Sequence, residues 1–217
     1  NTEKLFFTLG KLKMLKNFFF ISLIVFITSS KVNADIIITV LGDSLVSGYG
    51  VARQNSFPSI LKKELLEKKI HAKVINAGVS GDTSAGGLER LDWVLQEKPD
   101  ILILVLGSND MLRGINPEFT KKNLSSIIKK SIDRNIIVLL CGMKSGENMG
   151  KVYKKKFDSI YTSLKDMYPI YFYPFFLEGV ALNPKLNQVD LMHPNKHGIK
   201  LIAKKITPTL YNIIKKL

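Results

Sequence analysis

Five short apolar runs are the feature that most restricts what this chain of 217 residues can fold into. They are rich in β-branched side chains and show little of the polar alternation that a half-exposed strand would have. Runs of this kind are typical of strands buried on both faces of a parallel sheet. They occupy residues 35–41, 72–76, 101–106, 136–140 and 170–173.

Amphipathic stretches follow each of these runs, with apolar residues at helical spacing, and they are predicted helices. They cover residues 56–67, 84–96, 117–134, 153–167 and 195–216. Leu88, Leu91, Trp93 and Leu95 are the apolar residues of the second helix, and Pro208 is expected to kink or break the last one. The alternation predicts an α/β domain, a three-layer α/β/α sandwich around a five-stranded parallel sheet.

The first 34 residues are expected to be a targeting segment and not part of the folded domain. Three lysines precede the apolar run 18–28, and Val32-Asn33-Ala34 ends the segment with a small residue. These are the three parts of a secretory signal, so we expect cleavage after Ala34 and a periplasmic or secreted protein. An uncleaved membrane anchor is the alternative. Met14 would be an ordinary start for such a signal, and residues 1–13 would then be upstream sequence.

The mature part, residues 35–217, is long enough for one domain with its own core. The formal net charge is +14, of which residues 1–34 supply +4 through five Lys and one Glu. Lysines scattered over predicted helices explain the rest, and no nucleic-acid recognition motif occurs. The single cysteine, Cys141, allows no intramolecular disulfide and is expected to be a buried, inert thiol.

Polar residues suited to chemistry follow the first three predicted strands, where parallel sheets place their sites. Ser44 comes directly after the first strand, where its hydroxyl can meet a substrate, although a serine there can also cap a helix. Gly81 follows the second strand and lets the backbone approach a ligand, or belongs to a plain turn. Asn109 follows the third and can donate to an oxyanion, or forms an Asx turn with Asp110.

His193 precedes the last helix and is the base that a nucleophilic serine needs at neutral pH. Asp190 lies three residues earlier, close enough to bond the imidazole ring and to stabilise it when charged. His197, in the first turn of the last helix, is the rival base. His71 lies on a predicted polar connection and is expected at the surface.

These four blocks, in this order, resemble the SGNH hydrolases, also called GDSL esterases. The blocks are Gly42-Asp43-Ser44-Leu45, Gly81, Gly107-x-Asn109-Asp110 and Asp190-x-x-His193. The resemblance implies the flavodoxin-like SGNH hydrolase fold, with Ser44 as nucleophile, His193 as general base and acid, and Asp190 orienting His193. It also implies an oxyanion hole made by the Ser44 N–H, the Gly81 N–H and the Asn109 side chain. No metal or organic cofactor is implied.

Further residues resemble the periplasmic acyl-thioesterase, lysophospholipase and arylesterase branch of that family. They are the stretches 80–84, 109–114 and 142–150, with Tyr153. The resemblance implies a hydrolase of carboxylic esters, acyl thioesters or lysophospholipids that forms an acyl-enzyme. We expect a monomer with weak affinity for membrane surfaces and none for nucleic acid. Met111, Leu112, Ile115 and Met143 are expected either to line an acyl groove or simply to pack.

Two other functions stay open on the sequence. A glycan O-acetylesterase of the cell envelope would use the same fold, because one fold hosts many activities. A non-catalytic acyl-binding protein would also keep the fold, although it would be expected to lose the serine, the asparagine or the histidine, and all three are present.

Overall fold

The computed structural model describes residues 36–217, and the predicted signal segment lies outside the described residues. Those residues form one parallel sheet of five strands in the order β2-β1-β3-β4-β5. This is the order of flavodoxin-like folds. The strands are β1 (Ile36–Gly42), β2 (Ala72–Gly78), β3 (Ile101–Val105), β4 (Ile137–Cys141) and β5 (Tyr171–Tyr173).

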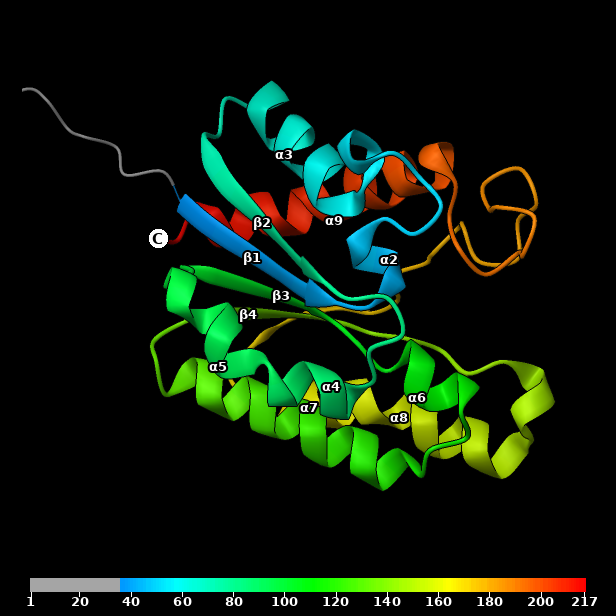
Figure 1. Ribbon diagram of the computed structural model, residues 1–217. Helices are drawn as coiled ribbons and strands as arrows, with labels where there is room; N and C mark the ends of the chain where they lie inside the picture. Colours follow the sequence, from blue (N-terminus) through cyan, green and yellow to red (C-terminus); the bar gives the residue numbers. More distant parts are fainter. Residues whose placement is uncertain (1–35) are drawn as a thin grey trace, which may run out of the picture. The chain divides into compact units, whose positions relative to one another are not determined.

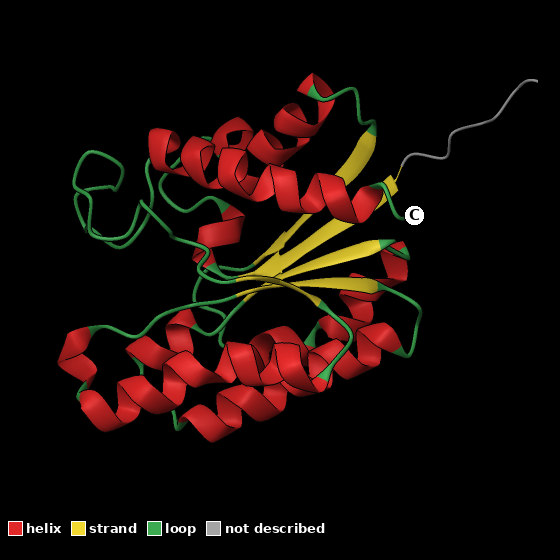
Figure 2. Cartoon of the chain, turned by 180° about the vertical axis from the view of Figure 1, so that it is seen from behind, coloured by secondary structure: helices red, strands yellow, loops and turns green. Residues whose placement is uncertain are grey.

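Helices cover both faces of the sheet, as Figures 1 and 2 show from opposite sides. The helices α3 and α9 pack together on one face, and α4, α5, α7 and α8 lie on the other. The predicted three-layer α/β/α sandwich is therefore confirmed. The helices are α2 (Ser44–Ser47), α3 (Phe57–Glu67), α4 (Ser84–Glu89), α5 (Leu91–Val94), α6 (Ser108–Leu112), α7 (Pro117–Ile132), α8 (Lys151–Met167) and α9 (Lys196–Ile214), with short 3₁₀ turns at Arg53–Asn55, Leu95–Glu97 and Glu147–Met149.

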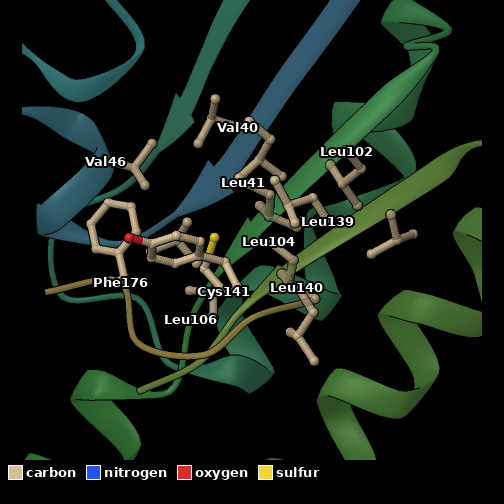
Figure 3. Close-up of a cluster of buried hydrophobic side chains, with 14 of the residues drawn as sticks. Val40, Leu41, Val46, Leu102, Leu104, Leu106, Leu139, Leu140, Cys141 and Phe176 are labelled. Carbon is tan, nitrogen blue, oxygen red and sulfur yellow. The ribbon is translucent and has the colours of Figure 1, made fainter. Parts of the chain in front are cut away.

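The core lies between the sheet and its two helical layers. All five residues of β3 are buried, because this strand has neighbours on both edges and helices on both faces. Figure 3 shows side chains of β1, β3 and β4 meeting Val46 of α2 and Phe176 of the loop after β5. Cys141 is part of this cluster, and burial raises the pKa of its thiol, so the inert thiol predicted from the sequence fits its surroundings.

Two predicted helices differ from the structure. Residues 84–96 form α4, α5 and a 3₁₀ turn, with a break at Arg90 after the weak helix formers Gly86 and Gly87. Trp93, taken as apolar packing, is exposed. The last helix, in contrast, continues through Pro208 without a break. Pro208 and Lys204 are both exposed, so the carbonyl that loses its amide partner lies on the solvent side of the helix.

The sheet, its covering helices and the core lie within one compact unit that begins at Asp35, so this part is expected to fold on its own. No helix in residues 36–217 has both the length and the apolarity needed to cross a bilayer.

Candidate active site

The site begins where β1 and its two neighbours, β2 and β3, end together. Gly42, the last residue of β1, pairs with Gly78 of β2 and with Val105 of β3. The segments that follow these strands therefore leave the sheet side by side. A side chain at position 78 would run into the backbone N of Ser47, so glycine is needed for the second segment to lie against α2.

Asp43 caps the helix α2, while Ser44 keeps its hydroxyl available for another contact. The buried Asp43 carboxylate caps α2 by accepting a hydrogen bond from the Leu45 N–H at 3.0 Å. Ser44 is the first residue of the helix and not its cap, which leaves its hydroxyl free. Its Oγ lies 3.0 Å from Nε2 of His193. The alternative that Ser44 itself is the cap is therefore wrong.

Asp190 completes the arrangement on the far side of the imidazole. Its Oδ2 lies 2.6 Å from Nδ1 of His193, and its Oδ1 accepts the backbone N–H groups of Met192 and His193, both at 2.9 Å. These donors lower the pKa of Asp190 to about 2, with the His193 backbone N–H contributing most. Asp190 is therefore ionised at neutral pH and can hold the ring with its Nδ1 protonated.

The loop that carries Asp190 and His193 is fastened to the segment after β1. Gln188 lies outside any helix or strand, and its backbone N–H donates a hydrogen bond to the His193 carbonyl at 2.8 Å. Its side-chain amide donates to the Tyr49 carbonyl, also at 2.8 Å. The Tyr49 ring lies against the His193 ring, with centroids 4.6 Å apart. Tyr49 and Gln188 could not be predicted as site residues, because neither belongs to a recognisable motif.

Two backbone N–H groups near the serine have no acceptor among the described residues. They belong to Ser44 and to Gly81. Gly81 has a φ of 86°, in the left-handed region that glycine adopts without strain, and its carbonyl accepts from Arg113 at 2.7 Å. A Ser47–Ser80 hydroxyl contact at 2.8 Å keeps the two segments together. The predicted oxyanion donors from the backbone are thus available for a ligand.

Asn109 lies in α6 at the end of β3, but its amide already has partners. Nδ2 donates to the Asp82 carbonyl at 2.9 Å and lies 3.3 Å from Oδ2 of Asp43. An amide nitrogen carries two hydrogens, so an oxyanion would have to replace the longer of these contacts. The Asx-turn alternative does not hold. Asp110 is buried and accepts from Ser84 and Thr120, which ties α4 and α7 to this corner.

Arg90 connects the segments that carry these donors. Its Nε pairs with the Asp82 carboxylate at 2.6 Å. Its Nη2 donates to the Gly42 carbonyl at 3.0 Å and to the Ala77 carbonyl at 2.8 Å. One half-buried guanidinium thus joins the end of β1, the end of β2 and the residue whose backbone holds Asn109. This role of Arg90 could not be predicted, since an arginine inside a predicted helix carries no distinguishing signal.

The rival base His197 is exposed and has no hydrogen bond to the Ser44 hydroxyl, which lies against His193 instead. His71, expected at the surface, is exposed. Within residues 36–217, no group of three or more His, Cys, Asp and Glu side chains is arranged to hold a metal ion.

The four residues predicted to form an acyl groove have different surroundings. Met143 is buried in the core, so for this residue the packing alternative holds. Met111 is partly buried against the core, Ile115 is partly exposed, and Leu112 is exposed. The stretch 142–150 connects β4 to α8 and is tied to that helix by a bond from the Ser145 N–H to Asp158 at 2.7 Å.

This chain is similar to several known proteins. Residues 40–201 match the GDSL-like Lipase/Acylhydrolase family. An arylesterase of Vibrio mimicus is 38% identical over 172 residues, which cover 79% of this chain and 86% of the relative. The Escherichia coli protein named thioesterase 1/protease 1/lysophospholipase L1 is 36% identical over 165 residues, covering 76% and 78%. The crystal structure of esterase EstA from Pseudoalteromonas, inhibited by monoethylphosphonate, superposes with a TM-score of 0.79 at 31% identity, covering 83% of this chain and all of that one.

Proposed function

Because this chain belongs to the GDSL-like lipase/acylhydrolase family, we propose that it hydrolyses esters and thioesters through an acyl-enzyme on Ser44. The observation that carries the proposal is the pair of contacts on the His193 ring, 3.0 Å from Nε2 to the Ser44 hydroxyl and 2.6 Å from Nδ1 to Asp190. A serine, a base and a carboxylate in this order are what nucleophilic acyl transfer needs.

In the first half-reaction, Ser44 Oγ attacks the acyl carbon while His193 Nε2 takes the hydroxyl proton. The charged imidazolium is stabilised by the ionised Asp190 carboxylate. Negative charge develops on the former carbonyl oxygen, and the Ser44 and Gly81 N–H groups bind it, joined by Asn109 Nδ2. Collapse breaks the bond to the alcohol or thiol, which leaves with the proton from Nε2.

In the second half-reaction, water attacks the acyl group on Ser44. His193 Nε2 takes a proton from that water, and the same three donors hold the oxyanion again. Collapse breaks the bond to Oγ, returns the proton to Ser44 and releases the carboxylic acid. The reaction needs no redox step.

The substrate class follows from the names of the relatives, an arylesterase and a thioesterase/lysophospholipase. Carboxylic esters and acyl thioesters are therefore the first substrates to test. Leu112 ends α6, the helix that carries Asn109, and Ile115 follows that helix; both are proposed to contact the acyl chain. Export to the periplasm and a monomeric state remain predictions, the former because the signal segment lies outside the described residues.

The test is hydrolysis of p-nitrophenyl esters and acyl-CoA thioesters of graded chain length by residues 35–217. Ser44→Ala and His193→Ala should each lower kcat/KM by at least 10³-fold, since each removes a group that acts only with the others. Ser159→Ala, on the exposed face of α8, and His197→Ala, four residues from His193, are the controls and should stay within threefold of the unaltered protein.

Retention of more than a few per cent of the activity in Ser44→Ala would overturn the acyl-enzyme. Turnover of acetylated sugars with none of the acyl esters would favour the glycan O-acetylesterase.

A further inference from the structure

The loop between β5 and α9, residues 174–195, exposes four large apolar side chains. Leu182 is 82% exposed, Val189 is fully exposed, and Leu191 and Met192 are about half exposed. Figures 1 and 2 show that this loop, gold to orange in Figure 1, projects beyond the carboxyl ends of the strands. Desolvating four such side chains together would be strongly favourable.

The other exposed apolar residues of the described part are spread over several elements. Leu112 lies on α6 and Phe119 on α7, and α8 exposes Val152 and Met167 at its two ends. Leu66 on α3 and Trp93 on α5 come shortly before the amino ends of β2 and β3, opposite the loop. Single apolar residues on a surface are ordinary and need no partner, whereas a cluster on one loop marks a contact site.

Two of these exposed residues have a strained backbone conformation. Leu182 has a φ of 60° and Leu191 a φ of 59°, in the left-handed region that non-glycine residues seldom adopt. Leu191 is held there by the turn in which Asp190 accepts the Met192 and His193 N–H groups. A surface that meets Leu191 and Met192 therefore meets the immediate neighbourhood of the base His193.

The charges around the loop favour an anionic surface. Of the two carboxylates of the loop, Glu178 pairs with Lys205, and Asp190 is hydrogen-bonded to the His193 ring, which is charged only when protonated. One negative charge of the loop therefore stands against three nearby lysines. Lys144, Lys185 and Lys196 have no carboxylate partner among the described residues. The Lys144 ammonium lies 5.1 Å from the ring centre of Phe175, at the start of the loop. Apolar side chains between unpaired cations suit the boundary of a bilayer with anionic headgroups.

We propose that the 174–195 loop docks on the surface of a bilayer that contains anionic phospholipids, with Leu182, Val189, Leu191 and Met192 entering the headgroup region. The docking would place His193 and Ser44 at the lipid–water boundary, where an acyl ester with a long chain resides. That consequence rests on the proposed function, but the docking itself does not.

The experiment measures binding of residues 35–217 to vesicles by sedimentation, with pure phosphatidylcholine compared with a mixture containing phosphatidylglycerol. Binding to the anionic vesicles should exceed binding to the neutral ones at least fivefold and should fall in 0.5 M salt. The double variant Leu182→Asn/Val189→Ser should lose at least fivefold in binding, since asparagine tolerates the left-handed backbone. Leu66→Ser, at the opposite edge, is the control and should bind as the unaltered protein does.

A second readout uses the single tryptophan of the chain. Trp93 lies away from the loop, so its emission should not shift when vesicles are added. In a Trp93→Phe/Val189→Trp variant the emission should move to shorter wavelength.

Equal binding of the double variant, or no blue shift at position 189, would overturn the proposal. A concentration-dependent dimer that Val189→Ser abolishes would identify a second copy of the chain as the partner instead. Hydrolysis of a soluble short ester by the double variant should be unchanged. Loss of docking and failure of the proposed chemistry are therefore distinguishable.

Discussion

At the scale of single residues, Asp43 and Ser44 are adjacent in sequence but differ in their exposure to solvent. Asp43 is completely buried beneath α2, while Ser44 lies within reach of the base on the loop before α9. Burial raises the pKa of the Asp43 carboxyl to about 6, opposed mainly by the Leu45 N–H and the facing His193, while Asp82 adds repulsion. The residue that caps the nucleophile's helix is therefore itself sensitive to pH.

This raised pKa predicts how stability changes with pH. The folded pKa lies above the unfolded value, so the stabilisation is complete below pH 4 and is lost as pH rises through about 6. Between pH 5 and pH 8 the free energy of unfolding should fall by roughly 1 kcal/mol because of Asp43 alone. Urea unfolding of Asp43→Asn, which stays neutral and can still accept from the Leu45 N–H, should lack this component. Parallel curves for both proteins would contradict the assignment.

The residues that sequence reasoning could reach are those with a chemical signature. Ser44 follows a predicted strand, Asp190 and His193 precede the last predicted helix, and the resemblance to SGNH hydrolases implies their roles. The structure brings their side chains together. Tyr49, Gln188 and Arg90 could not be found in this way. Their roles depend on backbone carbonyls and ring faces whose positions exist only in the folded chain.

At the scale of elements, the strands and most helices were predictable because burial on both faces leaves an apolar run, and amphipathic spacing marks each covering helix. The single helix predicted at 84–96 is divided at Arg90, after the weak helix formers Gly86 and Gly87. Of the kink or break expected at Pro208, the break does not occur, because the lost bond lies on the solvent side of α9 while its other face is buried.

Arg90 offers a test at this scale, because it joins the ends of β1 and β2 to Asp82. Arg90→Lys cannot make all of these contacts and should lower kcat about 10- to 100-fold with KM changed less than threefold, since the contacts position oxyanion donors and not the substrate. Arg134→Ala, which breaks an exposed pair with Asp92, is the control. If the variant instead loses activity only in proportion to its folded fraction, so that kcat per folded molecule is normal, the role of Arg90 is purely structural.

At the scale of the whole molecule, the polar residues of the site all lie at the carboxyl ends of the parallel strands. The strands end level, and the segments after β1, β2, β3 and β5 supply the proposed nucleophile, the proposed oxyanion donors, and the proposed base with its carboxylate. The α/β/α architecture was predictable from alternation alone. The fit between those segments was not, because it depends on side-chain bonds across 149 residues of sequence.

The measurement that tests the central claim most directly is the site of covalent attachment. Residues 35–217 would be treated with a p-nitrophenyl alkylphosphonate, whose phosphorus accepts the serine oxygen as p-nitrophenolate leaves, and then digested and sequenced by mass spectrometry. The account predicts one adduct per molecule, on Ser44, with activity lost in proportion and no adduct in His193→Ala over the same time. A stable adduct on another residue, or full modification of Ser44 with ester hydrolysis retained, would contradict it.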